Sequence, residues 1–247
     1  SNYKYSRKGD LSMSIYWVIL IVMALNGVVL LGLSLLSRSK LMLRHHTRKD
    51  WPRKVPDAEH ARNRTINSVV STAMVFGVCF GLNGQLFTEV RQSFFAIVVQ
   101  TTLILALYDF GYYFLHRFAF HEWSVGRKWH GVHHRIRSPY VQDSLFIHPV
   151  ETVLGLALFF LCVLIVGPVS VYAFGFAFFV YSAWNLFIHS AFDLPFFPFK
   201  TMSSLVTHHD LHHRSMKAGY YASLTPIYDH LFGTATEHKK RHVGTQT

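Results

Sequence analysis

The sequence predicts an all-α integral membrane protein with about five membrane spans and a histidine-rich cap. Five apolar stretches are long enough, or nearly so, to cross a bilayer, which takes about 20 residues. Charged residues make up only 15% of the 247-residue chain, whereas ordinary soluble domains contain about 25%. Eleven histidines fall between His116 and His213, mostly at the ends of apolar stretches. The length is that of one domain with tails.

The five predicted spans follow one another along the chain. The fourth is short for a span, and only Gly167-Pro168 separates it from the fifth. Because this pair is a turn signal, the last two spans are expected to form a tight helical hairpin. The spans are Ile15–Leu36, Ile66–Phe87, Phe94–Leu115, Val150–Val166 and Val169–Ile188.

The distribution of Lys and Arg predicts the orientation of the spans. Nine lie in the loop 37–64, five in 116–148 and six after residue 188, against three before the first span and Arg91 on the opposite side. Cytoplasmic loops carry the excess of Lys and Arg, so the histidines are expected on the cytoplasmic side. The same tendency accounts for the net charge of +11 without a nucleic acid partner. The basic loop 37–64 is expected at the membrane surface, where its side chains reach lipid phosphates.

The histidines are spaced so that several share a helix face. His130, His133 and His134 are three and four residues apart, and His209, His212 and His213 repeat this pattern. Residues at this spacing lie on one side of an α-helix, so two opposed helices could present six imidazoles to one cavity. His116 and His121 are five apart, which does not match one α-helical face. His116 is therefore expected in the last turn of the third span and His121 just beyond it.

This supply of imidazole predicts a two-metal centre. It exceeds what one four-coordinate ion uses, and a structural zinc site would leave more than half of the histidines idle. Nitrogen ligands suit zinc, copper, iron and nickel alike, so coordination chemistry alone leaves the metal open. Two iron ions fit the ligand number and an oxidative role beside lipid best.

Two polar residues near the predicted ends of spans are the candidate catalytic residues. Asp109 lies seven residues before His116, hence on the same helix face, and an acid within a span is usually functional. It is the first candidate for a carboxylate that orients an imidazole, although a bond to a neighbouring helix is the alternative. Asn185 lies one turn before His189. Asp210, Asp229 and Glu151 are weaker carboxylate candidates.

Several motifs in the chain resemble those of a known family. HRFAFH, WHGVHH and HHDLHH match, in order, the three histidine boxes of the sterol desaturase and fatty acid hydroxylase superfamily, and IHPVE, NLFIH and TPIYDHLFGT are further matches. The resemblance covers roughly residues 94–235. It implies a membrane-bound di-iron enzyme that uses O2 and two electrons to hydroxylate or desaturate a lipid.

The resemblance also implies a set of metal ligands. Asn185 stands where fatty acid 2-hydroxylases of this family have a histidine, so His148 is a candidate for the missing ligand, with Asn185 as a weak ligand or a neighbour of one. His208 is a further surplus imidazole. The ligands expected are His116, His121, His130, His133, His134, His148, His189, His209, His212 and His213.

Domain organisation, partners and location follow from the same resemblance. Residues 1–93 are expected to form N-terminal spans with the basic loop, 94–235 the catalytic domain, and 236–247 a basic tail. No haem motif of a fused cytochrome b5 is present, so electrons are expected from a separate cytochrome b5 or ferredoxin-type donor with its reductase. The membrane is expected to be the endoplasmic reticulum or a bacterial inner membrane.

Hydroxylation is favoured over desaturation, and the HPVE and Asn185 features favour a sterol-like substrate over a simple acyl chain. Two other classes of function are alternatives to an enzyme. A metal transporter or metal-binding protein would place ionisable ligands near mid-bilayer on several helices, and here only Asp109 is partly inside. A catalytically inactive scaffold that retains the boxes is the other.

Overall fold

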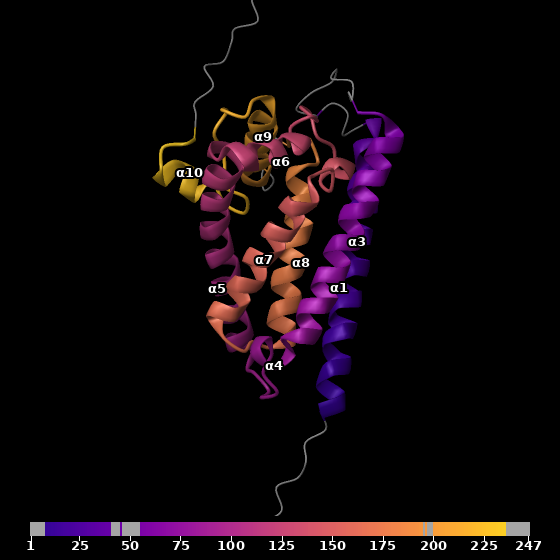
Figure 1. The fold of residues 1–247 in the computed structure, drawn as a ribbon, viewed down its shortest axis with the longest axis vertical. Coiled ribbons are helices and arrows are strands. Elements are labelled where there is room, and N and C mark those ends of the chain that lie inside the picture. Colours follow the sequence, from indigo (N-terminus) through magenta and orange to yellow (C-terminus); the bar gives the residue numbers. More distant parts are fainter. Residues whose placement is uncertain (1–7, 41–44, 46–54, 195, 197–199, 236–247) are drawn as a thin grey trace, which may run out of the picture.

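The computed structural model describes residues 8–40, 45, 55–194, 196 and 200–235. Most of the basic loop expected at the membrane surface and all of the tail 236–247 lie outside these residues. Five long helices run along the molecule, and short helices gather at one end of it (Figure 1). The long helices are α1 (Lys8–Ser37), α3 (Asp57–Gly81), α5 (Phe94–Phe114), α7 (Pro149–Val166) and α8 (Val171–Ile188).

The short elements form most of the cap that carries the histidines. A π-helix, η1, continues directly from α5, and of the short elements in the described part of the chain only the four-residue α4 lies at the opposite end of the bundle (Figure 1). These elements are α4 (Asn83–Leu86), η1 (Leu115–Glu122), α6 (Ser124–His133), η2 (Val141–Asp143), α9 (Lys200–Arg214) and α10 (Ile227–Leu231).

Four of the described helices are long and apolar enough to cross a membrane. They cover Ile15–Ser37, Phe94–Glu122, Pro149–Val166 and Val171–Ile188. The fifth expected span lies in α3, which runs the length of the bundle but begins earlier than predicted, among charged residues, and ends at Gly81.

Polar contacts explain why α3 is less apolar than its neighbours. Asn67 is fully buried, its Nδ2 donates to the Ile147 carbonyl at 2.9 Å, and its Oδ1 accepts from Thr152 Oγ1 at 2.5 Å. These bonds join α3 to α7 and to the loop before it. The polar residues of α3 thus serve packing and, as described below, line a cavity.

Helix packing places α7 and α8 at the centre of the bundle. α1 packs along α8, α3 packs on α7, and α5 packs on both. The turn expected between the last two spans is present: α7 ends at Val166, and Gly167 turns the chain with φ of 98°, a conformation that favours glycine. The hairpin is not tight, however, because aromatic side chains such as Phe159 and Phe174 lie between the two helices and keep their backbones apart. Val169 then bonds to the Leu86 carbonyl at 2.8 Å, which fixes this turn to α4.

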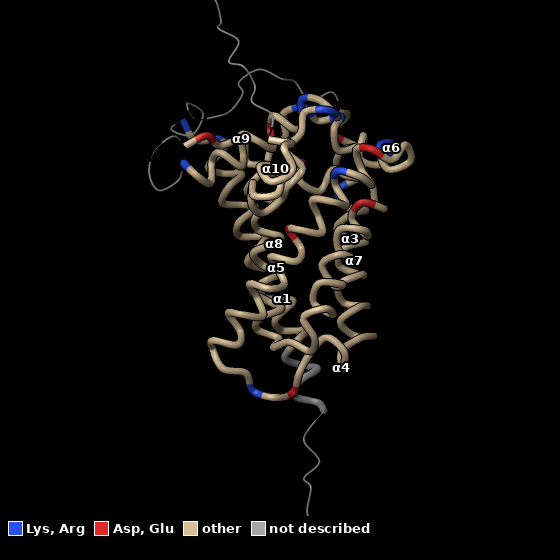
Figure 2. Tube along the Cα trace, turned by 90° about the vertical axis from the view of Figure 1, so that its left-hand side faces the viewer, with Lys and Arg blue, Asp and Glu red and all other residues tan. Residues whose placement is uncertain are grey.

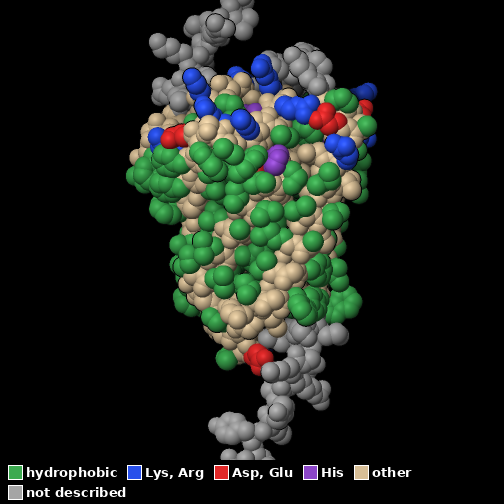
Figure 3. Space-filling view, viewed as in Figure 1, with side chains coloured by type: hydrophobic (Ala, Val, Ile, Leu, Met, Phe, Trp, Pro, Cys, Tyr) green, Lys and Arg blue, Asp and Glu red, His purple; other side chains and the backbone are tan. Residues whose placement is uncertain are grey.

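Charge and hydrophobicity are sharply divided along the molecule. Lys and Arg gather at the capped end (Figure 2), and hydrophobic side chains cover the flanks below it (Figure 3). Together with the four apolar helices, this distribution is that of a multi-pass membrane protein whose histidine cap lies at its basic end.

Candidate metal centre

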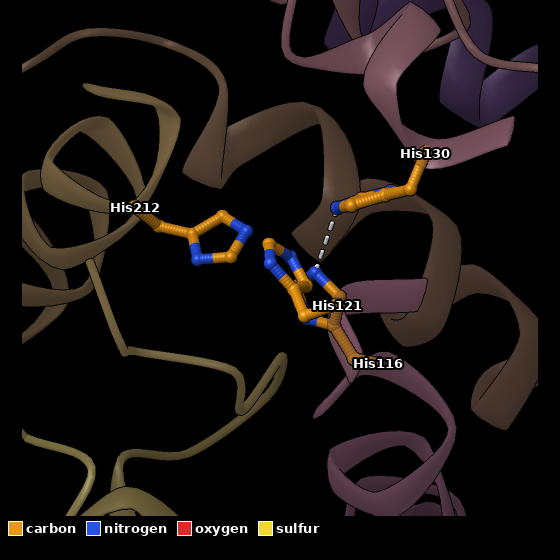
Figure 4. Close-up of side chains that lie close together, drawn as sticks. All are labelled: His116, His121, His130 and His212. Carbon is orange, nitrogen blue, oxygen red and sulfur yellow. Dashed lines mark hydrogen bonds between the residues drawn. The ribbon is translucent and has the colours of Figure 1, made fainter. Parts of the chain in front are cut away.

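Eight histidines form two adjoining groups in the cap. Within each group, one ring nitrogen from every residue lies within 4.8 Å of the others. We call His116, His121, His130 and His212 the first histidine group, and His133, His189, His209 and His213 the second. In the first group, rings from η1, α6 and α9 converge from different sides on one point (Figure 4).

His116 and His121 face the same point because η1 is a π-helix. Its hydrogen bonds join residues five apart, as when the Trp123 N–H donates to the Phe118 carbonyl at 2.8 Å. Residues five apart therefore lie one above the other on the helix surface, and the two imidazole centroids lie 4.9 Å from each other. The prediction that His121 lies just beyond the helix is wrong, because the chain continues as a π-helix through Glu122 and π-helical spacing relates the two residues.

Helices α6 and α9 each supply both groups. From α6, His130 enters the first group and His133 the second; from α9, His212 enters the first, and His209 and His213 the second. The two predicted histidine faces do oppose each other. They divide their imidazoles between two points instead of sharing one.

Close backbone contact sets the position of α6. A Cβ on Gly126 would lie 1.7 Å from the Ala119 carbonyl oxygen of η1. Only glycine allows the start of α6 to approach η1 this closely. This contact positions His130, one turn further along α6, against His116, with their Nε2 atoms 3.0 Å apart.

Backbone carbonyls hold most of the imidazoles by the Nδ1 atom. A carbonyl oxygen only accepts hydrogen bonds, so Nδ1 carries the proton and Nε2 presents its lone pair inward. The pairs are His116 with Tyr221 (2.7 Å), His121 with Met216 (2.7 Å), His133 with Phe146 (3.2 Å), His189 with Asn185 (2.6 Å), His212 with Gly219 (2.7 Å) and His213 with Ile136 (2.8 Å).

Burial favours the neutral form of His189 and of the three α9 histidines in the two groups. Loss of solvation lowers the pKa of His189 to about 3, and it lowers the pKa of His209, His212 and His213 well below the usual 6.5, with neighbouring histidines adding to the effect. At neutral pH these four rings therefore have no second proton to share across the centre.

Neutral rings that present Nε2 inward are suited to bind cations. The Nε2 of His189 lies 3.2 Å from that of His133, although both Nδ1 atoms are committed to carbonyls. Two lone pairs at this separation repel each other unless a cation lies between them. In the first group, the buried Nε2 of His121 has no hydrogen-bond partner among the described residues. Each group is thus able to bind a metal ion.

One carboxylate contacts the first group directly. Glu151 Oε1 lies 2.8 Å from His130 Nδ1, and both side chains are buried. The sequence pattern favours Asp109 over Glu151 as the carboxylate that orients an imidazole. Glu151 lies in the first turn of α7 rather than near a histidine box, so only the fold brings it to His130.

Asp109 contacts no imidazole; it takes the alternative raised from the sequence, in that it bonds to another part of the chain. Its Oδ1 accepts from the Leu224 N–H at 2.8 Å and its Oδ2 from Thr225 Oγ1 at 2.6 Å. Asp229 holds the same loop through the Tyr221 N–H at 2.8 Å. The loop carries the Tyr221 carbonyl that binds His116, so Asp109 acts on the histidine group through the backbone.

The remaining predicted residues lie around the two groups. His134 caps α6, and its Nε2 lies 3.1 Å from the Nε2 atoms of His130 and His212. His148 lies outside both groups: it caps α7 by accepting from the Val150 N–H at 3.2 Å. His208 is also outside and stacks on Tyr220, with centroids 4.3 Å apart.

Asn185 contributes through its backbone as well as by position. Its carbonyl fixes the His189 ring, and its side chain lines the cavity described next. Sequence reasoning missed the carbonyls of Met216, Gly219 and Tyr221. No residue type signals such a role, since every residue carries a carbonyl.

A cavity of about 340 Å³ leads from the histidine groups into the bundle. His116, His133 and His189 form its inner end, and aromatic residues such as Tyr108 and Phe178 form its walls. Its exposed lining residues, Met23, Gly27 and Ser68, all belong to α1 and α3. The mouth of the cavity therefore lies between these two helices, on the apolar flank of the molecule.

Fold and site together define a multi-pass membrane protein with a buried, histidine-lined centre able to bind metal. The chain belongs to the fatty acid hydroxylase family, whose model matches residues 101–234. No solved structure matches this chain.

Curated relatives match a little more than half of this chain. Methylsterol monooxygenase 1 of Rattus norvegicus is 31% identical over 143 residues, covering 53% of this chain and 44% of the relative. The same-named protein of Gallus gallus is 27% identical over 158 residues, covering 60% and 50%. The very-long-chain aldehyde decarbonylase GL1-11 of Oryza sativa subsp. indica is 32% identical over 152 residues, covering 58% and 54%. The chain spans about half the length of these relatives.

Proposed function

We propose that the protein is a membrane-bound, di-iron, O2-dependent oxidoreductase that hydroxylates or desaturates an unactivated C–H bond of a lipid. The observation that carries this proposal is the position of two four-histidine groups at the inner end of a cavity whose mouth faces the apolar flank. A lipid can reach such a site from the bilayer without crossing water. The names of the relatives, a methylsterol monooxygenase and a very-long-chain aldehyde decarbonylase, support lipid chemistry.

Each histidine group would hold one iron ion. His134 would add a ligand beside the first group, since its Nε2 lies near those of His130 and His212. The chemistry that two bound irons would supply is the oxidation of a C–H bond by O2 with two electrons from a donor. With two protons, hydroxylation balances as one alcohol and one water.

The protein's own residues would position ligands and substrate. Glu151 would offset part of the charge of the cations, because the ring ligands carry no negative charge, and would keep His130 in the tautomer that presents Nε2. The walls of the cavity would exclude bulk water from the reacting carbon and hold it against the centre. Sterol-like and long-chain substrates are the preferred classes, and hydroxylation is the preferred outcome.

A separate electron donor is expected at the basic end. Arg and Lys side chains gather on the surface of the cap (Figure 3), and a donor of cytochrome b5 or ferredoxin type would approach there. By the positive-inside tendency this end would face the cytoplasm, whether of a eukaryotic cell or of a bacterium.

Comparison of cellular lipids tests the proposal. Cells that express the wild type should contain one lipid class with a gain of one oxygen or a loss of two hydrogens, and cells that express His130→Ala should not. His208→Ala is the matched control, because His208 lies next to a ligand but outside both groups. An identical lipid profile for the wild type and His130→Ala in aerated cells would refute the enzyme.

A further inference from the structure

A polar pair lines the cavity at some distance from the histidine groups. Asn26 of α1 donates through Nδ2 to Ser182 Oγ of α8 at 2.8 Å and to the Val22 carbonyl at 2.9 Å. Ser182 in turn donates to the Phe178 carbonyl at 2.6 Å. The pair thus fixes one polar point in a largely apolar chamber.

These contacts leave one strong acceptor unused. The Val22 carbonyl can only accept, so it must face the amino side of the Asn26 amide, which assigns the amide's orientation. Asn26 Oδ1 is consequently the free end. It is buried and has no hydrogen-bond partner among the described residues. A buried acceptor in this state destabilises the protein until a donor reaches it.

The charges around the cavity restrict what that donor is. Among the described residues, the lining contains no Lys or Arg, and its one carboxylate, Glu151, is engaged with His130. A carboxylate or phosphate head group would find no counter-charge there. An uncharged hydroxyl group fits the acceptor.

The distance from this acceptor to the histidine groups follows from α8. Ser182 precedes His189 by seven residues, which places both on one face of the helix, about 10 Å apart along its axis at 1.5 Å per residue. A substrate held at Asn26 would therefore present to the centre a carbon about 10 Å from its hydroxyl group.

We propose that Asn26 Oδ1 anchors the substrate by accepting a hydrogen bond from the hydroxyl group of an uncharged lipid. The proposal rests on the function proposed above and names its substrate class. Asn26 lies outside residues 101–234, which match the family model. The N-terminal helices would thus select the substrate for a centre that the family domain carries.

Lipid capture tests the anchor. Purified full-length protein in detergent micelles is incubated with total yeast lipid extract, and with the same extract after acetylation of its free hydroxyl groups. Captured lipids are quantified by mass spectrometry. The wild type should enrich hydroxyl-bearing neutral lipids, and acetylation should reduce their capture about tenfold, as expected for loss of one hydrogen bond to a buried acceptor. This comparison needs no variant.

Asn26→Leu should lose the same enrichment, also about tenfold. Asn83→Leu is the matched control: Asn83 Oδ1 is likewise buried without a partner, but Asn83 does not line the cavity. Capture that acetylation leaves unchanged, no enrichment of hydroxyl lipids, or equal enrichment by Asn26→Leu and the wild type would each overturn the proposal.

Iron content of the same samples separates this proposal from the enzyme itself. Asn26→Leu should retain the iron of the wild type, since Asn26 contacts no histidine of either group. A wild type without iron that still captures hydroxyl lipids would refute the proposed function and leave the anchor standing.

Discussion

Glu151 Oε1 and His130 Nδ1 lie 2.8 Å apart with both side chains buried, and this is the one contact between a carboxylate and either histidine group among the described residues. It joins the first turn of α7 to α6 at the point where the cavity reaches the centre. A carboxylate on the outer nitrogen of a ligand fixes the ring and strengthens its inner nitrogen as a donor. Glu151 is therefore central to metal affinity in the proposed enzyme.

Glu151→Gln should lower iron affinity or activity by about 10- to 100-fold, the usual effect of losing such a partner. The amide keeps a similar shape but loses the negative charge that offsets the cation. Iron per chain and product formation measure the effect. Glu59→Gln is the matched control, because Glu59 binds Arg135 at the surface, and full iron binding and activity in Glu151→Gln would contradict this role.

Asp109→Asn should destabilise the protein and weaken the first histidine group more than the second. An amide keeps only one acceptor: with its oxygen on the Leu224 N–H, its NH2 group faces Thr225 Oγ1, and the Thr225 hydroxyl hydrogen loses its acceptor, at a cost of about 1–3 kcal/mol. The loop would then hold the Tyr221 carbonyl less firmly against His116. A lower thermal midpoint together with weaker binding of one of two irons is expected, whereas equal weakening of both would argue against action through this loop.

Gly126→Ala should displace α6 and abolish iron binding. The added Cβ would lie 1.7 Å from a backbone oxygen of η1, which has no flexible side chain to move aside. The expected cost is at least that of overpacking a core, about 1–3 kcal/mol. Gly131→Ala, on the same helix, has open space around its Cβ and should retain iron. Equal iron content in the two variants would contradict the packing argument.

The metal-free protein should lose stability as the pH falls below about 6.5. Burial lowers the pKa of His189 from 6.5 to about 3, so between these values the unfolded chain binds more protons than the folded one. Stability then falls with decreasing pH through this window. His209 and His213 act in the same direction. The thermal midpoint of chelator-treated protein should therefore drop between about pH 7 and 5, and a midpoint constant over that range would contradict the neutral, buried state of these rings.

The order of helices and the histidine clusters could be predicted because both depend on local spacing. Apolar length marked the long helices, Gly167-Pro168 marked the turn between the last two, and the repeated three- and four-residue spacing placed histidines on faces of α6 and α9. The division of those faces into two groups depends on how two helices oppose each other. Spacing within one helix does not contain that information.

The remaining errors have physical causes of the same kind. The π-helix at η1 alters the periodicity that relates His116 to His121. Glu151, and not Asp109, contacts an imidazole, because tertiary packing rather than distance along the chain decides which carboxylate reaches a ring. His148 stands before Pro149 at the start of a helix, and its ring is used to cap that helix.

Titration of ferrous iron into the metal-free chain tests the central claim most directly. The wild type should bind two ions, and His116→Ala and His189→Ala should each bind about one with high affinity, because each variant damages a different group. A wild type that binds a single ion, or two variants that lose both ions together, would contradict two separate histidine sites.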